Sequence, residues 1–229
     1  MSTKTDSHDI EVVEKLLAAR FSCRAFKSNP VPRIAIERVL GAAQKTASWC
    51  NSQPWQVTIL GGDALRKFSE VIYKAASEGH HVSDFPFPRE YKGVYLDRRR
   101  ESGFQLYNAL GIPRGDKPGY QKQMLENFRF FGAPHVAIIT TDEALGVYGA
   151  VDCGGYVSSF MIAAQALGIA TVPQAALAGH SDVIRAQLGL GDDRRVVCGI
   201  SFGYADETHP ANSYRTSRAS IPEAATFIE

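Results

Sequence analysis

Two short segments near the N-terminus carry side chains suited to holding a charged heterocyclic ligand. In the first segment, Arg20, Ser22 and Arg24 stand at alternating positions. Because alternate side chains of an extended backbone point the same way, these three would share one face. Two guanidinium groups and a hydroxyl on one face suit a phosphate group. The first segment therefore predicts an anion site, with a surface salt-bridge cluster as the alternative.

The second segment carries two carboxamides. Asn51 and Gln53 stand just before a short apolar run over residues 55–60. A carboxamide offers both hydrogen-bond donors and acceptors, which suits the edge of a heterocycle such as a flavin. An ordinary turn is the alternative interpretation. Taken together, the two segments favour a cofactor site over two unrelated surface features.

Motifs of several other enzyme classes are absent from the sequence. Gly189-Leu190-Gly191 lacks the third glycine of a dinucleotide-binding turn, and no Walker loop or G-x-S-x-G elbow occurs. The six histidines show no metal-ligand spacing, so we predict no metal site. Cys23 lies between cationic neighbours that would lower its pKa, but a bystander thiol is favoured over a nucleophile. The pattern favours chemistry performed by a bound cofactor.

The composition limits the class of protein. The chain has 229 residues, of which 45% are hydrophobic and 21% charged, and its net charge is +1. It lacks the basic excess that is typical of proteins that bind nucleic acid or membrane surfaces. It has no C-x-x-C pair and no apolar run of about 18 residues. We predict a single cytoplasmic domain over residues 1–229 with neither nucleic acid nor membrane as a partner.

Hydrophobic periodicity predicts the elements that position the two segments. Apolar residues at helical spacing predict helices over 9–19, 33–46, 63–76, 145–167 and 181–188. Asp9 and Asp63 are expected to cap two of these helices. Apolar runs predict strands over 55–60, 135–141 and 195–204, with a further short segment over 170–176. These elements do not follow a regular β-α-β order.

Two further stretches differ in character from the rest. Residues 80–120 are rich in aromatic residues and prolines, with a helical part over 90–110 and loops at both ends. Such a segment is typical of a lid or binding loop, although its aromatics could equally complete the core or a subunit interface. The polar tail over 206–229 has little ability to fold alone. It therefore predicts an extended arm on a second subunit.

The chain resembles the FMN-dependent nitroreductase family. Its segment over 80–120 is longer than in the shortest members and resembles that of a subgroup acting on nitrobenzoate-like or other substituted nitroaromatic compounds. The order and spacing of short elements carry the resemblance: Arg20-x-Ser22-x-Arg24-x-Phe26, Ser48-x-x-Asn51-x-Gln53-Pro54-Trp55, Phe130-Phe131-x-Ala133-Pro134, Ala166-Leu167-Gly168, Pro173-Gln174-Ala175 and Arg215-x-x-Arg218. Two departures stand out. Ala47 replaces the proline that many members have before the serine, and Gln174-Ala175 replaces a Glu-Gly or similar pair.

The resemblance implies an α+β fold with a central, mostly antiparallel sheet flanked by helices. It also implies an obligate homodimer that exchanges the arm over 206–229 and binds FMN in the interface. The residues implied to bind FMN are Arg20, Ser22, Arg24, Ser48, Asn51, Gln53, Asn127, Pro173, Gln174, Ala175, Arg215 and Arg218. Of these, Ser48, Asn51 and Gln53 would reach the ring from the other subunit. Residues 80–120 would form the lid, and its aromatics Phe85, Phe87, Tyr91 and Tyr95 would stack on the substrate ring.

The resemblance also implies an activity. NAD(P)H would reduce FMN and leave, and a nitroaromatic compound would then be reduced to the nitroso and hydroxylamine products, with the amine as a further possible product. Arg24, near the N1–O2 edge, would stabilise negative charge on the reduced flavin. The alternatives are an enone reductase, dehalogenase or flavin-cleaving enzyme on the same fold, a non-enzymatic flavin-binding redox sensor, and a cofactor-free interaction domain.

Overall fold

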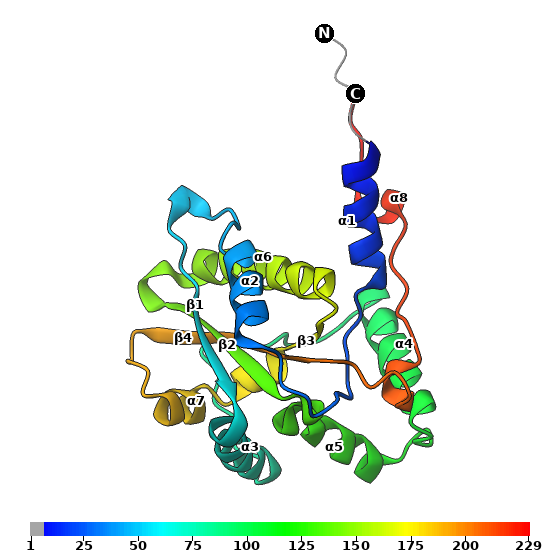
Figure 1. The fold of residues 1–229 in the computed structure, drawn as a ribbon. Helices are drawn as coiled ribbons and strands as arrows, with labels where there is room; N and C mark the ends of the chain where they lie inside the picture. Colours follow the sequence, from blue (N-terminus) through cyan, green and yellow to red (C-terminus); the bar gives the residue numbers. More distant parts are fainter. Residues whose placement is uncertain (1–6) are drawn as a thin grey trace.

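A four-stranded sheet forms the centre of the protein (Figure 1). The structure, a computed structural model, describes residues 7–229. The strands are β1 (Gln56–Gly61), β2 (His135–Asp142), β3 (Ala170–Gln174) and β4 (Arg194–Gly203). They lie in the order β1-β2-β4-β3, and each neighbouring pair is antiparallel. The predicted α+β class with an antiparallel sheet flanked by helices is confirmed.

Successive residues of β2 feed two separate cores, one on each side of the sheet. Ala137 and Ile139 pack with α2 and α6, while Val136 and Ile138 pack with α3 and α7. This alternation is the period-two pattern of a strand whose two faces are both covered. All four side chains are fully buried, which explains why the run is continuously apolar. The bounds of these helices are α2 (Arg33–Ala43), α3 (Gly62–Ser77), α6 (Gly146–Ala166) and α7 (Ser181–Leu188).

The two predicted helix caps are wrong. Helix α1 (Ser7–Ala19) begins before Asp9, so this residue lies in the first turn. Helix α3 has Gly61 at its N-cap position, so Asp63 also lies in a first turn. Both carboxylates still face the positive end of a helix dipole, which is the physical reason that acidic residues collect there.

Residues 117–132 contain structure that the sequence pattern did not predict. Helix α5 (Lys117–Leu125) is followed by a 3-10 helix, η2 (Glu126–Gly132), whereas the helical part predicted over 90–110 corresponds to α4 (Val94–Ala109). Pro118 marked this stretch as a loop, but it lies at the start of α5, where a proline is tolerated. Asp116 caps the helix by accepting a hydrogen bond from the Gly119 N–H at 3.0 Å.

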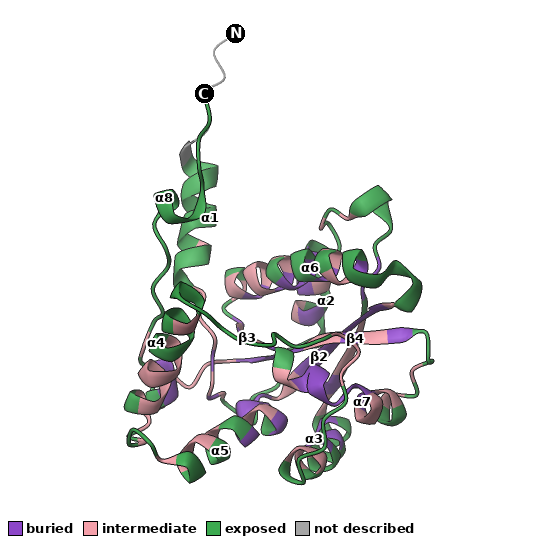
Figure 2. Cartoon of the chain, turned by 180° about the vertical axis from the view of Figure 1, so that it is seen from behind, coloured by how far each residue is buried: buried purple, intermediate pink, exposed green. Residues whose placement is uncertain are grey.

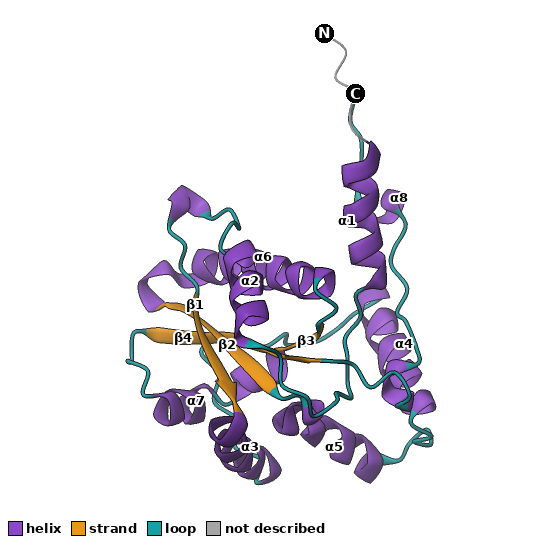
Figure 3. Cartoon of the chain, in the orientation of Figure 1, coloured by secondary structure: helices purple, strands orange, loops and turns teal. Residues whose placement is uncertain are grey.

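Helix α1 and the C-terminal arm lie together to one side of the sheet (Figures 1 and 3). The arm over 206–229 contains η5 (Pro210–Asn212) and α8 (Ile221–Ala224), and it contacts α4 through Ser217–Glu101 and Arg98–Glu223. Figure 2 shows that α1 and α8 are exposed along most of their length. Their solvent-facing apolar side chains are Ile10, Val12, Val13, Leu17 and Ile221, joined by Phe227 and Ile228. Within the described residues, no helix has the length and apolar character to cross a membrane.

Candidate functional site

Residues from both ends of the chain meet around one cavity of about 260 Å³, here called the arginine cavity. The predicted anion-binding residues Arg20, Ser22 and Arg24 form one wall. Arg215 and Arg218 of the arm form another, although almost two hundred residues separate the two groups in sequence. The remaining lining residues are Leu17, Ala18, Phe21, Ser102, Tyr214 and Thr216.

The extended backbone at 22–25 sorts its side chains as the spacing predicts. Cys23 and Ala25 are buried against the core, and the Cys23 N–H donates to the Thr171 carbonyl at 3.0 Å. The alternate residues are thereby turned towards the cavity. The side chain of Asn212 holds the arm in place, because it accepts from the Arg24 N–H at 2.8 Å and donates to the Ala25 carbonyl at 2.9 Å.

The four guanidinium groups of the arginine cavity have no compensating carboxylate in the part of the chain that the structure describes. Among residues 7–229, none of these arginines forms an ion pair. Partial burial and then the positive charge of Arg218 lower the pKa of Arg20. Like charges held together at a partly buried position favour an anion between them. The donors fit a phosphate monoester such as that of FMN, and Arg20, Ser22, Arg215 and Arg218 would hold it.

A second cavity, of about 210 Å³, adjoins the first and is called the ring cavity. Arg24 lines both cavities, and Asn127 lines the second. The side-chain nitrogen of Asn127 donates to the Met124 carbonyl at 2.9 Å, so this residue is fixed within its own chain. The structure thus brings Asn127 close to the arginine segment, which its position in the sequence did not reveal.

The segment Pro173-Gln174-Ala175 lies at the junction of β3 and the 3-10 helix η4 (Ala175–Gly179). The Gln174 side chain is buried, and its nitrogen donates to the Asn127 backbone carbonyl at 2.8 Å. Its oxygen accepts from the Ser201 hydroxyl. Since both ends of this side chain are occupied, only the backbone of 174–175 remains to face a ligand.

Ser48, Asn51 and Gln53 lie on the exposed loop between α2 and β1, here called the carboxamide loop (residues 48–53). It includes η1 (Trp49–Asn51). The Gln53 N–H donates to Ser48 Oγ at 3.0 Å, and the Gln53 amide nitrogen donates to Asn51 Oδ1 at 3.2 Å. None of the three lines the arginine cavity, and Figure 1 shows their loop beside one end of α6, with α1 and the arm beyond the other end.

The carboxamide loop has an unusual backbone. Cys50, Asn51 and Gln53 have φ values of 51°, 55° and 47°. Non-glycine residues rarely adopt this left-handed region, and such strain collects at functional sites. Phe130 and Phe131, next to the ring cavity, show the same feature with φ values of 56° and 54°. The sequence carried no signal for either group, because neither segment is rich in glycine.

Of the predicted substrate-contacting aromatics, Phe85, Phe87 and Tyr91 lie on the loop between α3 and α4, and Tyr95 lies in the first turn of α4. Phe85 is half-buried, whereas Phe87, Tyr91 and Tyr95 are exposed. Phe87 packs edge-on against His81 at 5.2 Å, and Tyr91 lies under the Arg99 guanidinium at 5.1 Å. The aromatic side chains of 80–120 are therefore not part of the core of a single chain, which leaves the lid and the subunit interface as their possible roles.

Burial is the largest effect on the Cys23 thiol and raises its pKa to about 11. The cationic neighbours Arg24 and Arg215 lower this pKa, as expected, but they do not outweigh burial. Cys23 is thus a bystander in the core. Among the described residues, no three histidine, cysteine or acidic side chains are grouped as metal ligands.

Comparison with known proteins identifies the family. The sequence profile of the nitroreductase family matches residues 17–204. The chain belongs to the nitroreductase family. It is 38% identical to nitroreductase NfnB of Mycolicibacterium smegmatis over 95% of this chain and 93% of that protein. It is 32% identical to a 4-nitrobenzoate reductase of Pseudomonas putida over 95% of this chain and 94% of that protein.

A solved structure extends the likeness to the fold of this family member. The FMN-dependent nitroreductase NfnB from Mycobacterium smegmatis, crystallised in complex with NADPH, superposes with a TM-score of 0.91 at 37% identity. The match covers 96% of this chain and 99% of that one. The four-stranded sheet and the helices around it therefore form a fold that nitroreductases use.

Proposed function

We propose that this nitroreductase family member is an FMN-dependent NAD(P)H oxidoreductase that reduces nitroaromatic compounds. The observation that carries the proposal is the convergence of four arginines at the arginine cavity, where no described residue contributes a carboxylate. Its relatives include a nitroreductase crystallised with NADPH, a nitrobenzene nitroreductase and 4-nitrobenzoate reductases. A partly buried phosphate site beside a cavity sized for a ring is what a flavin mononucleotide needs.

The residues of the chain divide into those that bind and those that adjust charge. Arg20, Ser22, Arg215 and Arg218 would hold the phosphate. When bound, FMN supplies two-electron transfer between NAD(P)H and the acceptor. Arg24, which lines both cavities, would stabilise negative charge at the pyrimidine edge of the ring. NAD(P)H and the nitroarene would occupy one open face in turn, so we expect ping-pong kinetics.

We further propose that the enzyme is a homodimer that shares the cofactor site between its subunits. An exposed apolar patch on α6, η1 and the end of η3 (Glu143–Leu145), called the α6 patch, consists of Trp49, Leu145, Val147, Tyr148 and Val151. Trp49 packs against Tyr148 at 4.4 Å and lies within the carboxamide loop. Burial of this patch against a second copy would therefore carry Asn51 and Gln53 into the interface. The exposed apolar residues of α1 and the arm would be covered by the same association.

A spectroscopic titration tests the activity. The purified protein should show a flavin absorption spectrum, lose it on anaerobic addition of NADPH, and regain it on addition of a nitroarene. Light scattering should give the mass of two chains. A protein that remains colourless after addition of FMN would contradict the cofactor assignment. A flavin that NADPH reduces but nitroarenes do not reoxidise would contradict the reaction alone.

A further inference from the structure

Three imidazoles meet at a cavity that the cofactor assignment does not use. The cavity has a volume of about 310 Å³ and is called the histidine cavity. His80 and His81, which follow α3, lie with ring centres 6.2 and 6.4 Å from that of His180. The volume is at the lower end of the range for small-molecule sites, roughly 300–1,000 Å³. The other lining residues are Ala76, Gly79, Phe87, Met124, Phe128 and Ala176.

The histidine cavity is next to the predicted position of the flavin ring. Ala176 lines it and directly follows Ala175, whose backbone is expected to face the ring. Met124 lines both the histidine cavity and the ring cavity. A small aromatic molecule in the histidine cavity would therefore lie beside the cofactor, where an electron acceptor must be.

His180 is buried in a way that leaves it unsatisfied. His180 is only 4% exposed, and its Nδ1 atom has no hydrogen-bond partner among the described residues. The pKa of His180 is lowered, mainly by burial. The neighbouring His81 and His80 lower this pKa further, whereas Asp182 raises it. A buried polar atom without a partner is costly, and such atoms are uncommon unless a ligand satisfies them.

The charge around the histidine cavity suits an incoming anion. No carboxylate of residues 7–229 lines it, and the nearby Asp182 is already paired, since His80 Nε2 lies 2.8 Å from Asp182 Oδ2. Phe128 packs edge-on against His180 at 4.8 Å and, with Phe87 and Met124, supplies apolar surface. The cavity thus combines walls that suit an aromatic ring with imidazole nitrogens that can donate to an oxygen.

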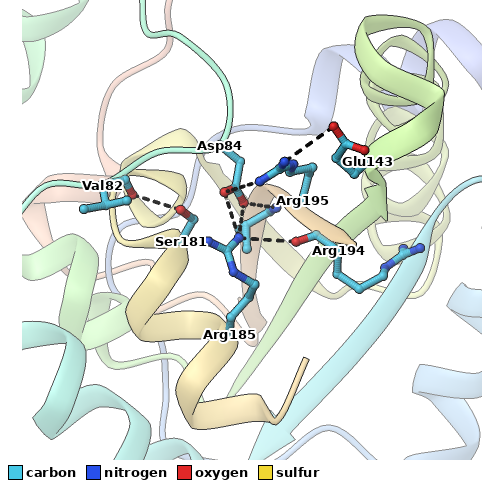
Figure 4. Close-up of polar contacts among 8 residues, drawn as sticks. Val82, Asp84, Glu143, Ser181, Arg185, Arg194 and Arg195 are labelled. Atoms are coloured by element: carbon cyan, nitrogen blue, oxygen red, sulfur yellow. Dashed lines mark hydrogen bonds and ion pairs between the residues drawn. The ribbon is translucent and has the colours of Figure 1, made fainter. Parts of the chain in front are cut away.

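Hydrogen bonds and ion pairs at Val82 and Asp84 hold the loop that carries His80, His81 and Phe87 (Figure 4). The Val82 N–H donates to the Gly179 carbonyl at 2.8 Å, and the Ser181 N–H donates to the Val82 carbonyl at 2.9 Å. The Asp84 carboxylate accepts from Arg185 at 2.7 Å and from the Val196 N–H at 2.7 Å. These contacts hold the loop against η4, α7 and β4, so the cavity is preformed.

We propose that the histidine cavity is the acceptor subsite of this enzyme and takes a nitroarene that carries a carboxylate, with His180 as the residue that selects the carboxylate. The inference rests on the proposed function, because it requires a flavin beside Ala176. The ring of the substrate lies between Phe87, Met124 and Phe128, and the imidazole N–H groups donate to the carboxylate oxygens.

A matched pair of substrates tests the proposal. Steady-state KM and kcat are measured for 4-nitrobenzoate and for nitrobenzene, which lacks the carboxylate, with wild type and His180→Phe. Loss of a hydrogen bond to a charged group should raise KM for 4-nitrobenzoate by about 10-fold or more. KM for nitrobenzene, FMN content and the rate of flavin reduction by NADPH should change by less than about twofold. His180→Asn, which keeps an amide N–H near Nδ1, should recover part of the affinity.

Two more variants keep the test decisive. His81 lines the same cavity at an exposed position, so we expect the fold to tolerate its replacement. His81→Phe should also raise KM for 4-nitrobenzoate selectively. His8 is exposed on α1, and His8→Phe is the control, which should change KM for neither substrate. Equal effects on both substrates, or no effect in His180→Phe and His81→Phe, would overturn the carboxylate subsite while leaving the proposed function intact. A wild-type protein that reduces neither nitroarene would instead refute the proposed function.

Discussion

The arginine cavity and the carboxamide loop are both predicted to bind the same cofactor, yet the chain treats them in opposite ways. The arginine cavity is partly buried, and its two halves are tied together by Asn212. The carboxamide loop is exposed, carries left-handed non-glycine residues and lies away from that cavity. The lining of the arginine cavity comes from a single chain, whereas the carboxamide loop faces solvent and contributes no residue to that cavity.

This difference indicates that the proposed FMN site is divided between two subunits. In the proposed site, the chain would hold the phosphate end by itself, whereas the carboxamides expected at the ring edge lie next to the exposed α6 patch. Such an arrangement is expected when each cofactor site takes one part from each of two identical subunits. Binding of the cofactor and association of the subunits would then stabilise each other.

The largest effect should come from the arginine cavity. Arg20→Ala combined with Arg218→Ala removes two charge-assisted contacts to the phosphate, and we expect FMN affinity to fall by about 100-fold or more. Fluorescence titration of the apoprotein with FMN measures the change. Arg33→Ala, at an exposed ion pair with Glu37, is the control. Unchanged affinity in the double variant would remove the arginine cavity from the cofactor site.

A charge placed in the α6 patch should show whether the arginine cavity binds FMN tightly without the carboxamide loop of a second subunit. Val147→Glu places a carboxylate on a side chain that is 70% exposed in one chain but buried in the proposed dimer. We expect light scattering to show monomers and FMN affinity to fall, even though the arginine cavity is untouched. Val71→Glu, at an exposed position on α3, should remain dimeric. A monomeric Val147→Glu protein that still binds FMN as tightly as wild type would mean that the site lies within one chain.

A buried ion pair outside both regions should affect stability and leave FMN affinity unchanged. Burial raises the pKa of Asp84, but hydrogen bonds from Arg185 and Val196 outweigh it, and the net pKa is lowered. A lowered pKa stabilises the fold above the unfolded-state pKa, and this contribution is lost as pH falls through the folded-state value. Asp84→Asn should cost about 3 kcal/mol in urea unfolding at pH 7, and the difference from wild type should shrink in acid. A difference that grew in acid would contradict the assigned role of the carboxylate.

The smallest effect should come from a single carboxamide. Asn51→Ala removes one neutral contact to the ring edge, so we expect FMN affinity to fall only by about 3- to 10-fold. The protein should remain dimeric, and its rate of flavin reduction by NADPH should change. Asn108→Ala, exposed on α4, serves as the matched control. A loss of FMN affinity as large as that of the arginine double variant would contradict the prediction that the arginine cavity contributes more to FMN binding than the carboxamide loop.

Much of the fold could be predicted because each buried strand has an unambiguous pattern. The apolar run of β2 and the helical spacing of α6 both gave the right element within one or two residues. Helix α5 was missed because Pro118 and Gly119 lower the intrinsic helix propensity, and only the Asp116 cap reveals the start. Local patterns report secondary structure well and helix starts poorly.

The candidate site could be predicted only where spacing is local. Arg20, Ser22 and Arg24 share a face because a strand alternates, which is visible in the sequence. The contact of Gln174 with Asn127 and Ser201 is a tertiary arrangement that no local pattern records. His180 meets His80 across a hundred residues, so six histidines without metal-ligand spacing gave no sign of the histidine cavity.

Complementation between two defective variants tests the shared site most directly. One chain carries Arg20→Ala and Arg218→Ala, and the other carries Asn51→Asp and Gln53→Glu, which replace both carboxamides by carboxylates. The two chains, with different affinity tags, are co-expressed and the mixed dimer is purified. If the site is shared, each mixed dimer contains one intact site, so we expect about one FMN per dimer bound with wild-type affinity, and nitroarene reduction at about half the wild-type rate. Mixed dimers no more active than the two parent variants would show that each subunit builds its cofactor site alone.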